Sequence, residues 1–477
     1  MENDKQIHIA MFPWLAHGHI SPYLELSNRL VHAGLKVSLI STGLNISRIR
    51  ESADKLVQLV AIPLPAIEGL PGEIENTADL PLDLMPLFEK AMDGLEKPFQ
   101  QIIRQIRPNC VVFDFFQWWT PRAVAAAQFG TPTIFFQTCG AAFSGYSIHP
   151  AWRGHGKEIT AHDLTIPPPD YPSSVISWKL FEAETVIGCY KPQNPGGISF
   201  LERGLKCYED CTAMAIKTCD EIEGSFVEYL QKKVVCKRVV PVGPLVALIA
   251  QSKIRASACL AWLEKQAPCS VVYVAFGSHS FLSSDQVKEI ALGLESSCLS
   301  FLWALRLPHG RAMKDVLPEG FKDRVEGRGF VTGDWVAQRE ILSHPSTGAF
   351  LTHCGWNSVM EGLSCGLPFI ALPIMLDQAI NARLLCEHLL VGFDVGRTED
   401  GSLCREEICR AARMVMDEEQ GRDFRLNARQ MGEVFRFKIV GSEEGIPLQE
   451  LYINNFIALL LQLTGNSQIA SPSQTTE

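Results

Sequence analysis

The sequence predicts an α/β protein with two doubly wound parallel-sheet domains that face a cleft. Short, continuous apolar runs alternate with helical patterns along the chain, and this alternation is typical of parallel sheets covered by helices on both faces. The pattern breaks near Pro241–Leu245 and then starts again. A length of 477 residues also suits two or three domains. In such folds, ligands lie at the carboxyl ends of the strands.

The first half of the chain supplies the first sheet. Its strands are expected at the apolar runs Ile7–Phe12, Lys36–Thr42, Cys110–Phe116 and Thr131–Thr138. A helical pattern over Tyr23–Gly34 joins the first two runs. The stretch from Ala151 to Asn194 is rich in Pro, Gly and His, and we interpret it as a long surface excursion, where ligand contacts often lie.

The second half supplies another parallel set. After a helical pattern at Ala261–Gln266, strands are expected within Cys269–Ser278, Phe301–Arg306, Gly327–Trp335, Thr347–Gly355 and Phe369–Ile374. We therefore place one domain at 1–245, a linker at 246–258 and a second domain at 259–444. An amphipathic helix at about 445–463 is expected to pack back on the first domain, and 464–477 to form a loose tail.

Charge and cysteine usage narrow the classes of partner. Forty-three Lys and Arg residues against 53 Asp and Glu residues give a net charge of −10. Because no long basic run offsets this charge, the sequence argues against nucleic acid or an anionic membrane as a partner. The N-terminus lacks a signal-peptide pattern, and the apolar run Phe456–Leu463 is too short to span a bilayer. Fifteen scattered cysteines without a C-x-x-C pair favour a reducing compartment, so we expect a cytoplasmic protein.

The first strand and its loop test for dinucleotide binding. The loop Pro13–Pro22 lacks G-x-G-x-x-G, and the second strand ends in Ser41 and Thr42 without an acid for a ribose hydroxyl. A Walker-type phosphate loop is also missing from the sequence. NAD and ATP are therefore poor candidates, and we expect no bound cofactor.

The loop Thr352–Gly362 is more informative, because it follows an apolar strand and enters a helical pattern. The N–H groups and the dipole at such a helix start favour an anion. His353, Asn357 and Ser358 add side-chain donors that suit a pyrophosphate. Glu361 could accept hydrogen bonds from ribose hydroxyls, but Ser358 and Glu361 also have the spacing of a capping box. The spacing alone leaves both interpretations open.

The segment Trp335–Gln378 closely resembles the 44-residue donor signature of plant family-1 UDP-dependent glycosyltransferases, which have the GT-B fold. The matching positions are Trp335, Gln338, His353, Gly355, Trp356, Asn357, Ser358, Glu361, Pro373, Asp377 and Gln378. The resemblance implies an acceptor-binding first domain and a second domain that binds a UDP-sugar as co-substrate.

The resemblance also implies a role for each position. Trp335 would stack on uracil, the backbone at Val336 would pair with the base edge, and Glu361 would hold the ribose. The diphosphate would be bound by His353, Asn357, Ser358 and the loop at Ser278, and the sugar hydroxyls by Trp356, Asp377 and Gln378. Gln338 and Gly355 complete the predicted donor site. The structural alternatives are a core aromatic for Trp335 and a solvated helix start for the Asp377–Gln378 pair.

Transfer of a glycosyl group needs a base for the attacking hydroxyl, and histidine suits this work at neutral pH. The family's G-H-x-x-P context matches Gly18–Pro22, which favours His19 over His17 as the base and leaves His17 at the rim of the acceptor pocket. Asp114 ends an apolar strand, where an acid is costly unless paired, so we expect it to orient His19. A helix cap is the alternative for Asp114. Thr138 matches a position that touches the donor sugar or phosphate.

The implied mechanism is direct displacement with inversion at the anomeric carbon. The helix start at Trp356–Ser358, together with His353, would stabilise the departing UDP. The sequence has no D-x-D motif for a diphosphate-bound metal, so we expect no metal requirement.

Aromatic residues crowd the acceptor side, and some must belong to the core because alternate strand residues face opposite ways. Trp14 and the loop Gln117, Trp118 and Trp119 are the better pocket candidates, and they suit a flat apolar aglycone such as a flavonoid, terpenoid or steroid.

The stretch Phe12–Ser27 resembles the branch of the family that extends a sugar of a glycoside, as does aliphatic Leu372. Ala337 and Ala275 depart from the usual Pro and Ser, whereas Gln378 resembles glucose-using members. We expect glucose transfer onto the sugar of a glycoside. Direct glucosylation of an aglycone, a UDP-rhamnose or UDP-xylose donor, and a non-catalytic UDP-sugar-binding protein remain alternatives.

Overall fold

The computed structural model describes residues 6–128, 130–152, 158–191, 197–246, 258–277, 282–307, 311–417, 419, 421–436 and 446–465. The predicted linker lies almost entirely outside these residues, as do Ser278 and most of the predicted tail. The chain forms two compact units. Unit 1 comprises residues 1–153, 189–245 and 448–477, and unit 2 comprises residues 154–188 and 246–447.

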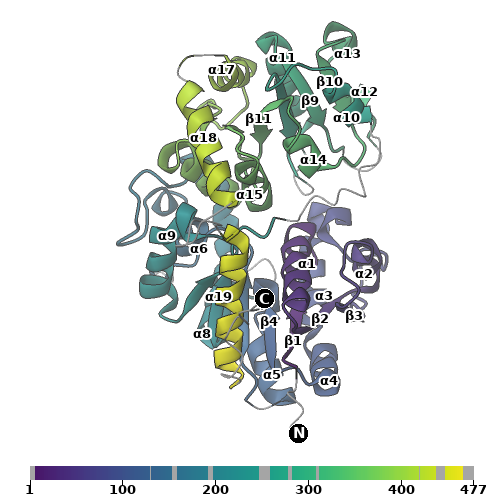
Figure 1. The fold of residues 1–477 in the computed structure, drawn as a ribbon, viewed down its shortest axis with the longest axis vertical. Helices are drawn as coiled ribbons and strands as arrows, with labels where there is room; N and C mark the ends of the chain where they lie inside the picture. The colour runs from purple at the N-terminus through teal and green to yellow at the C-terminus, as the bar shows by residue number, and fades with distance from the viewer. Residues whose placement is uncertain are drawn as a thin grey trace, which may run out of the picture. The chain divides into compact units, whose positions relative to one another are not determined.

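Unit 1 contains a seven-stranded parallel sheet with the order β3-β2-β1-β4-β5-β6-β7 (Figure 1). The strands are β1 (His8–Phe12), β2 (Lys36–Ser41), β3 (Gln58–Ala61), β4 (Cys110–Phe113), β5 (Thr133–Gln137), β6 (Ala213–Ile216) and β7 (Val239–Pro241). The helices are α1 (His17–His32), α2 (Gly43–Ile49), α3 (Met85–Asp93), α4 (Glu96–Ile106), α5 (Thr120–Ala127), α6 (Ala141–Ser147), α8 (Phe200–Asp210), α9 (Asp220–Tyr229) and α19 (Leu448–Leu463).

Unit 2 contains a six-stranded parallel sheet with the order β10-β9-β8-β11-β12-β13. The strands are β8 (Val271–Ala275), β9 (Ser300–Ala304), β10 (Gly329–Thr332), β11 (Thr347–Thr352), β12 (Phe369–Ala371) and β13 (Gly392–Asp394). The helices are α7 (Leu180–Val186), α10 (Ala258–Leu263), α11 (Ser284–Ser297), α12 (Met313–Val316), α13 (Phe321–Arg324), α14 (Gln338–Leu342), α15 (Trp356–Ser364), α16 (Gln378–Arg383), α17 (Arg405–Met416) and α18 (Gly421–Arg436). The predicted α/β class with two doubly wound parallel sheets is confirmed.

Each sheet has one point where the strand order reverses. In unit 1 the chain runs outward from β1 to β3 and then returns to place β4 on the other side of β1. In unit 2 it runs from β8 to β10 and returns with β11 beside β8. The loops at the carboxyl ends of such neighbouring strands diverge and leave room for a ligand. The predicted catalytic and phosphate-binding residues follow these strands.

Buried apolar strands explain both cores. All residues of β1, β4 and β8 are buried, as expected for strands covered on both faces. The helix α19 adds Ile453, Phe456 and Leu460 to the core of unit 1, and it runs beside α1 in Figure 1. In this way, the end of the chain belongs to the unit in which the chain begins.

Three local boundaries differ from the sequence prediction. The helix α1 begins at His17 rather than Tyr23, with Pro22 in its early turns, where proline is better tolerated than deeper in a helix. The strand expected to reach Phe116 ends at Phe113, because the Asp114 carboxylate accepts the N–H of Phe115 and starts a 3₁₀ turn. The excursion was assigned to the first domain, but residues 154–188 belong to unit 2.

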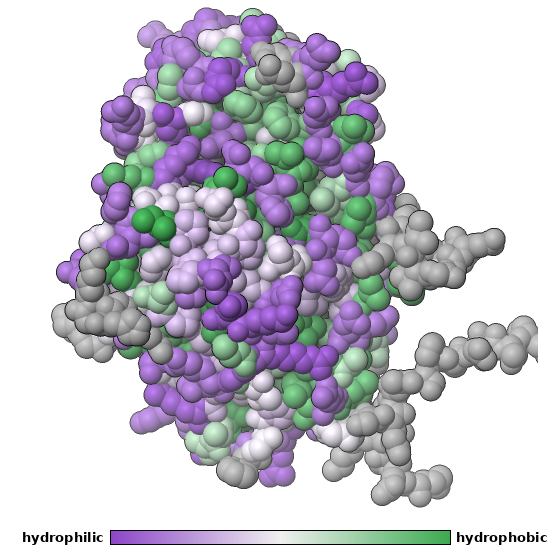
Figure 2. All heavy atoms as spheres, turned by 90° about the vertical axis from the view of Figure 1, so that its left-hand side faces the viewer, coloured by the Kyte–Doolittle hydropathy of each residue, from purple (hydrophilic) through white to green (hydrophobic). Residues whose placement is uncertain are grey.

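The surface carries few large exposed hydrophobic side chains among the described residues. Polar side chains cover much of the face in Figure 2, with hydrophobic residues in small groups between them. Trp335 is the exceptional aromatic, with 72 % of its surface exposed. No helix in the described part of the chain is long and apolar enough to cross a membrane.

Candidate active site

Adjacent strands bring His19 and Asp114 together. β1 and β4 pair in parallel, with Phe12 opposite Phe113, so the residues that follow them meet at the same edge of the sheet. His19 lies in the first turns of α1, and its Nδ1 is 2.8 Å from Oδ2 of Asp114. Asp114 is fully buried, whereas the His19 side chain keeps 18 % exposure. The pair therefore has a buried acid and an imidazole that solvent can reach.

The Asp114 carboxylate is held on every side. Its Oδ2 also accepts the backbone N–H of Trp14 at 3.2 Å, and its Oδ1 accepts that of Phe115 at 2.7 Å. Asp114 thus caps the following turn and contacts His19 at the same time, so both interpretations from the sequence hold for its geometry. When His19 donates its Nδ1 proton to this carboxylate, Nε2 keeps its lone pair and can act as a base.

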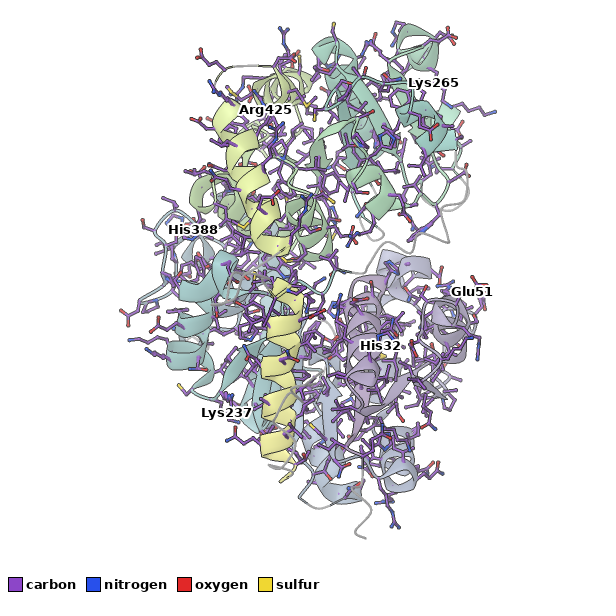
Figure 3. The ribbon with its side chains drawn as sticks, viewed as in Figure 1. His32, Glu51, Lys237, Lys265, His388 and Arg425 are labelled. Atoms are coloured by element: carbon purple, nitrogen blue, oxygen red, sulfur yellow. The ribbon has the colours of Figure 1, made fainter. Side chains whose placement is uncertain are left out.

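Two other histidines of α1, His17 and His32, differ from His19 in position and in hydrogen-bond partner. His17 is exposed and lies two residues earlier in the chain, and the hydrogen bond to Asp114 comes from His19. His32, labelled in Figure 3, ends the same helix and pairs its Nε2 with Oδ2 of Asp54 at 2.9 Å. Since α1 has 16 residues, His32 lies about 20 Å from its start.

Thr138 reaches the same imidazole from β5. Its Oγ1 is 3.0 Å from Nδ1 of His19. The helix α6 starts three residues later, and Glu223 accepts the N–H groups of Ala141 and Ala142, each at 2.8 Å. Burial raises the pKa of the Glu223 carboxyl group. Sequence reasoning missed Glu223, whose partner residues are about 80 positions away.

Most of the aromatic acceptor candidates are packed into unit 1. Trp14 is 4 % exposed and stacks on Phe116 with ring centroids 3.5 Å apart. Trp119 is also buried, and buried Gln117 donates its amide to the carbonyl of Pro13. Trp118 is half-buried, so it is more accessible than Trp14, Gln117 and Trp119.

A charged group that sequence reasoning missed borders these aromatics. Arg203 of α8 forms a two-point ion pair with Asp93 of α3, at 2.8 and 2.9 Å. Its guanidinium also lies over the Phe116 ring. The Trp118 indole donates its N–H to the same Asp93 carboxylate. A lone arginine within a helical pattern offered no signal for this role.

In unit 2, two glycines enclose the His353 ring. A Cβ atom on Gly277 would lie 2.7 Å from its Nε2, and one on Gly355 would lie 2.4 Å away. Gly277 also has a φ of +73°, which favours glycine. The loop therefore requires glycine on both sides of the imidazole, which follows β11 directly.

The helix start predicted to bind the diphosphate is well defined. α15 begins at Trp356, with Gly355 as its N-cap residue. Ser358 consequently lies inside the helix, so the capping-box interpretation of Ser358 and Glu361 is wrong. Glu361 instead accepts the Gln338 side-chain amide at 2.7 Å, and Tyr273 donates its hydroxyl to the Gln338 carbonyl oxygen. The bond between Gln338 and Glu361 fixes α14 to α15.

Trp335 lies just before α14 with its ring largely exposed. The Arg306 guanidinium is 5.7 Å from the ring centroid. Its exposure contradicts the core-aromatic alternative. An exposed indole face is suited to stacking on a flat base.

The Asp377–Gln378 loop is held by its own side chains. Gln378 is buried, and its Oε1 accepts the N–H groups of Ile374 and Met375 at 2.9 and 3.0 Å. Asn381 donates its amide to Oδ2 of Asp377 at 2.7 Å and to the carbonyl of Cys354 at 2.9 Å. Asn381 therefore connects the loop predicted to read the sugar with the loop predicted to hold the diphosphate. The i, i+4 spacing of Asp377 and Asn381 was the missed signal.

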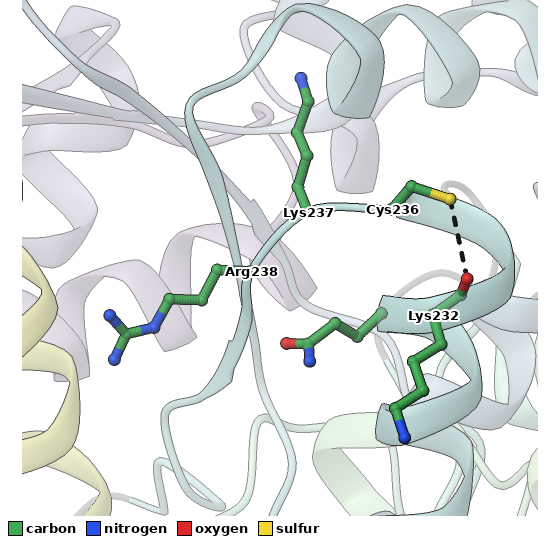
Figure 4. A pocket seen from close by; sticks show the side chains of 5 residues that line it. Lys232, Cys236, Lys237 and Arg238 are labelled. Carbon is green, nitrogen blue, oxygen red and sulfur yellow. Dashed lines mark hydrogen bonds between the residues drawn. The ribbon is translucent and has the colours of Figure 1, made fainter.

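Two hollows lie elsewhere in the described residues. One of about 700 Å³ is lined by Gln231, Lys232, Cys236, Lys237 and Arg238 (Figure 4). Its Lys237 already bonds to the carbonyls of Glu209 and Cys211, and Arg238 to Gln462. The other, of about 340 Å³, lies at the amino ends of β11 and β12, away from the predicted site residues.

Comparisons with known proteins identify the family and the fold. A family model described as "UDP-glucoronosyl and UDP-glucosyl transferase" matches residues 213–428. The chain is 36% identical over 474 residues to UDP-glycosyltransferase 91B1 of Arabidopsis thaliana, covering 96% of this chain and 98% of the relative. It is 35% identical over 465 residues to cyanidin 3-O-galactoside 2''-O-xylosyltransferase FGGT1 of Actinidia chinensis var. chinensis, covering 96% and 99%.

A solved structure shows the same fold. The crystal structure of Glycyrrhiza uralensis UGT73P12, complexed with glycyrrhetinic acid 3-O-monoglucuronide, matches with a TM-score of 0.80 at 23% identity, covering 96% of each chain. The predicted GT-B fold is confirmed.

Proposed function

Because the chain belongs to the family of UDP-dependent glycosyltransferases, we propose that it transfers glucose from UDP-glucose to a hydroxyl on the sugar of a plant small-molecule glycoside. Membership makes it a UDP-glycosyltransferase with a UDP-sugar as co-substrate. The choice of glucose and of a terpenoid, steroid or flavonoid glycoside as acceptor is our proposal, as is a cytoplasmic location.

The observation that carries the proposed chemistry is the His19–Asp114 pair at the strand reversal of unit 1. His19 Nε2 accepts the proton of the acceptor hydroxyl as its oxygen attacks the anomeric carbon. The bond from that carbon to the phosphate oxygen breaks, UDP departs, and the anomeric configuration inverts. Asp114 keeps the imidazole in the required tautomer and stabilises the imidazolium that forms.

Unit 2 supplies the donor side of the proposal. Trp335 stacks on uracil with Val336 at the base edge, and Glu361, held by Gln338, binds the ribose. The start of α15 and His353 bind the diphosphate and stabilise the negative charge that develops on the departing UDP. Trp356, Asp377 and Gln378 contact the sugar. Because the helix start provides this charge stabilisation and the sequence lacks a D-x-D motif, we expect transfer to continue in EDTA.

The acceptor is proposed from resemblance rather than from a pocket. The Actinidia relative is named for xylosyl transfer to the 2'' position of a cyanidin galactoside, which supports transfer onto an existing sugar. Direct glucosylation of an aglycone is the second candidate. The four predicted acceptor residues Trp14, Gln117, Trp118 and Trp119 stay predictions, together with His17 and Thr138.

The test is UDP release from purified protein with UDP-glucose and EDTA, against a panel that pairs each aglycone with its monoglucoside. We expect release with monoglucosides only. Release with aglycones alone would replace the proposed acceptor by the second candidate. Release that appears only when a divalent metal is added back would contradict the proposed charge stabilisation by α15.

A further inference from the structure

The excursion between β5 and β6 sends one short segment into unit 2. We call residues 178–182 the strap; they include the first turn of α7. The strap belongs to unit 2, although it lies between strands of unit 1 in the chain. Trp178 in the strap is 1 % exposed and donates its indole N–H to the carbonyl of Leu376 at 3.3 Å. That carbonyl directly precedes Asp377.

The loop that receives this bond has a demanding backbone. Leu376 has a φ of +53°, a region that non-glycine residues rarely adopt. Such a conformation persists only where its surroundings hold it. On one side the Gln378 side chain accepts two N–H groups of the loop, and on the other the Trp178 indole fixes the Leu376 carbonyl.

A chain of charges, buried at Glu182 and Arg383, anchors the strap to the helix that follows this loop. Both Glu182 carboxylate oxygens accept from Nη2 of Arg383, at 2.8 and 2.9 Å. Arg383 ends α16, which begins at Gln378. Its guanidinium also lies 3.4 Å from the Asp394 carboxylate, and Lys179 pairs with the same Asp394 at 3.0 Å. Because buried charges are stable only when well paired, this arrangement allows little displacement.

A third contact involves Phe181, the second aromatic residue of the strap. The Arg397 guanidinium lies over the Phe181 ring, and the same guanidinium donates to the carbonyl of Pro373 at the start of the loop. A Cβ atom on Gly401 would lie 2.6 Å from the Phe181 ring. The strap is therefore linked to three points of this loop. It reaches Pro373 at the start of the loop through Arg397, Leu376 within the loop through Trp178, and Arg383 beyond the loop through Glu182.

We propose that the strap positions Asp377 and Gln378, and so determines which donor sugar is accepted and how it is oriented. This inference rests on the proposed function of that loop. Trp178 and Glu182 are positioning residues: they act through Leu376 and α16. The residues proposed for the base and ribose, Trp335 and Glu361, lie at other elements, so we expect the strap to act on sugar binding much more than on UDP binding.

The decisive comparison is Trp178→Phe, which removes the indole N–H and keeps an aromatic ring. The matched control is Trp152→Phe in unit 1, which removes another buried indole-to-carbonyl bond, from Trp152 to Tyr146. Calorimetry gives the dissociation constants for UDP-glucose and for UDP. We expect Trp178→Phe to weaken UDP-glucose at least fivefold with UDP within twofold, and Trp152→Phe to change neither beyond twofold.

Kinetics supply the second readout. The ratio of kcat/KM for UDP-glucose to that for UDP-galactose should fall at least fivefold in Trp178→Phe. Glu182→Gln, which keeps hydrogen bonding to Arg383, should lie between wild type and Trp178→Phe. Unchanged UDP-glucose affinity and donor ratio in Trp178→Phe, or a parallel loss of UDP affinity, would overturn the inference.

Failure of the proposed function looks different. A wild-type protein that binds UDP-glucose without releasing UDP across the acceptor panel would contradict the proposed acceptor. The binding comparison would still test the strap.

Discussion

Asp114 illustrates how one buried side chain can serve structure and chemistry together. Its two oxygens accept the N–H groups of Trp14 and Phe115 and face His19. We expect Asp114→Asn to reduce kcat about 10²–10⁴-fold, because the neutral amide no longer stabilises the imidazolium. The KM for UDP-glucose should change little. Turnover within tenfold of wild type, measured by UDP release, would contradict the role.

Gln378 holds its loop through one side-chain atom, and we propose that the other contacts the donor sugar. Its Oε1 accepts the N–H groups of Ile374 and Met375, which leaves the amide nitrogen as the group available for a sugar hydroxyl. Gln378→His should lower kcat/KM for UDP-glucose about tenfold, because a ring nitrogen cannot accept both N–H groups and donate from the same place. Gln378→Glu keeps an acceptor oxygen for both N–H groups but loses the amide donor, so it separates the loop contact from the proposed sugar contact. An unchanged donor profile in the histidine variant would refute this role.

Which residues could be predicted depended on where their partners lie. His19 and Asp114 follow adjacent strands of a predictable sheet, so their pairing could be inferred. Trp178 and Glu223 instead bind backbone groups of distant segments, and no local pattern indicates such contacts. Trp14 and Trp119 were harder for the opposite reason, because a tryptophan in a loop after a strand can face a pocket or the core. The structure buries both.

Among the secondary-structure elements, the first three strands of unit 1 share a polar connection. Nε2 of His8 in β1 is 2.8 Å from Oγ of Ser38 in β2, which donates to Gln58 in β3. Burial, with a smaller effect from Lys36, lowers the His8 pKa from 6.5 to about 4. Between pH 6.5 and about 4, His8 is therefore neutral in the folded state but protonated in the unfolded chain.

The consequence is a loss of stability in acid. The contribution of neutral His8 to the free energy of unfolding is complete above the unfolded pKa of 6.5. It declines as the pH falls from 6.5 towards about 4. A shift of this size corresponds to about 3 kcal/mol in the free energy of unfolding. Denaturant titrations from pH 7 to pH 4 should show a shallower decline in His8→Gln than in wild type. Equal slopes for the two proteins would contradict this account.

The strap gives a stability prediction for α7 and α16. Glu182→Ala leaves Arg383 buried beside Asp394 alone and should destabilise unit 2 by about 3 kcal/mol. Glu182→Leu combined with Arg383→Met should recover most of the loss, because an apolar pair replaces the ion pair. The exposed Glu228–Lys232 pair is the control, and Glu228→Ala should leave thermal unfolding unchanged. A Glu182→Ala protein as stable as wild type would exclude a structural role for the pair.

The elements themselves were largely predictable, and their long-range partners were not. Continuous apolar runs predicted β1, β2, β4 and β5 in the first sheet and β8 to β12 in the second, because period and length identify buried parallel strands. The strands β3, β6, β7 and β13 were not predicted. The beginning of α1 and the end of β4 differ from the predicted bounds by several residues. The Asp114 cap sets the end of β4, whereas α1 begins after Ala16 without a side-chain cap. The excursion was assigned to the first domain because of its place in the chain. Its anchor, Arg383, lies 201 residues from Glu182.

The two units share one arrangement of strands and of a histidine at the sheet edge. Each sheet reverses its strand order once, and each reversal carries a histidine that follows the first or fourth strand of its unit. In unit 1 that histidine is His19, paired with a buried carboxylate. In unit 2 it is His353, enclosed by glycines beside a helix start. We therefore propose that the first unit supplies proton transfer and the second binds the diphosphate.

This division predicts that catalysis and nucleotide binding can be separated by one substitution. The measurement is UDP release from UDP-glucose by His19→Ala, with the glycoside acceptor that wild type uses fastest, beside the calorimetric affinity of the same protein for UDP. We predict that release falls at least 100-fold while the UDP dissociation constant stays within twofold of wild type. Turnover within tenfold of wild type in His19→Ala would contradict the assignment of the base, and with it the proposed mechanism.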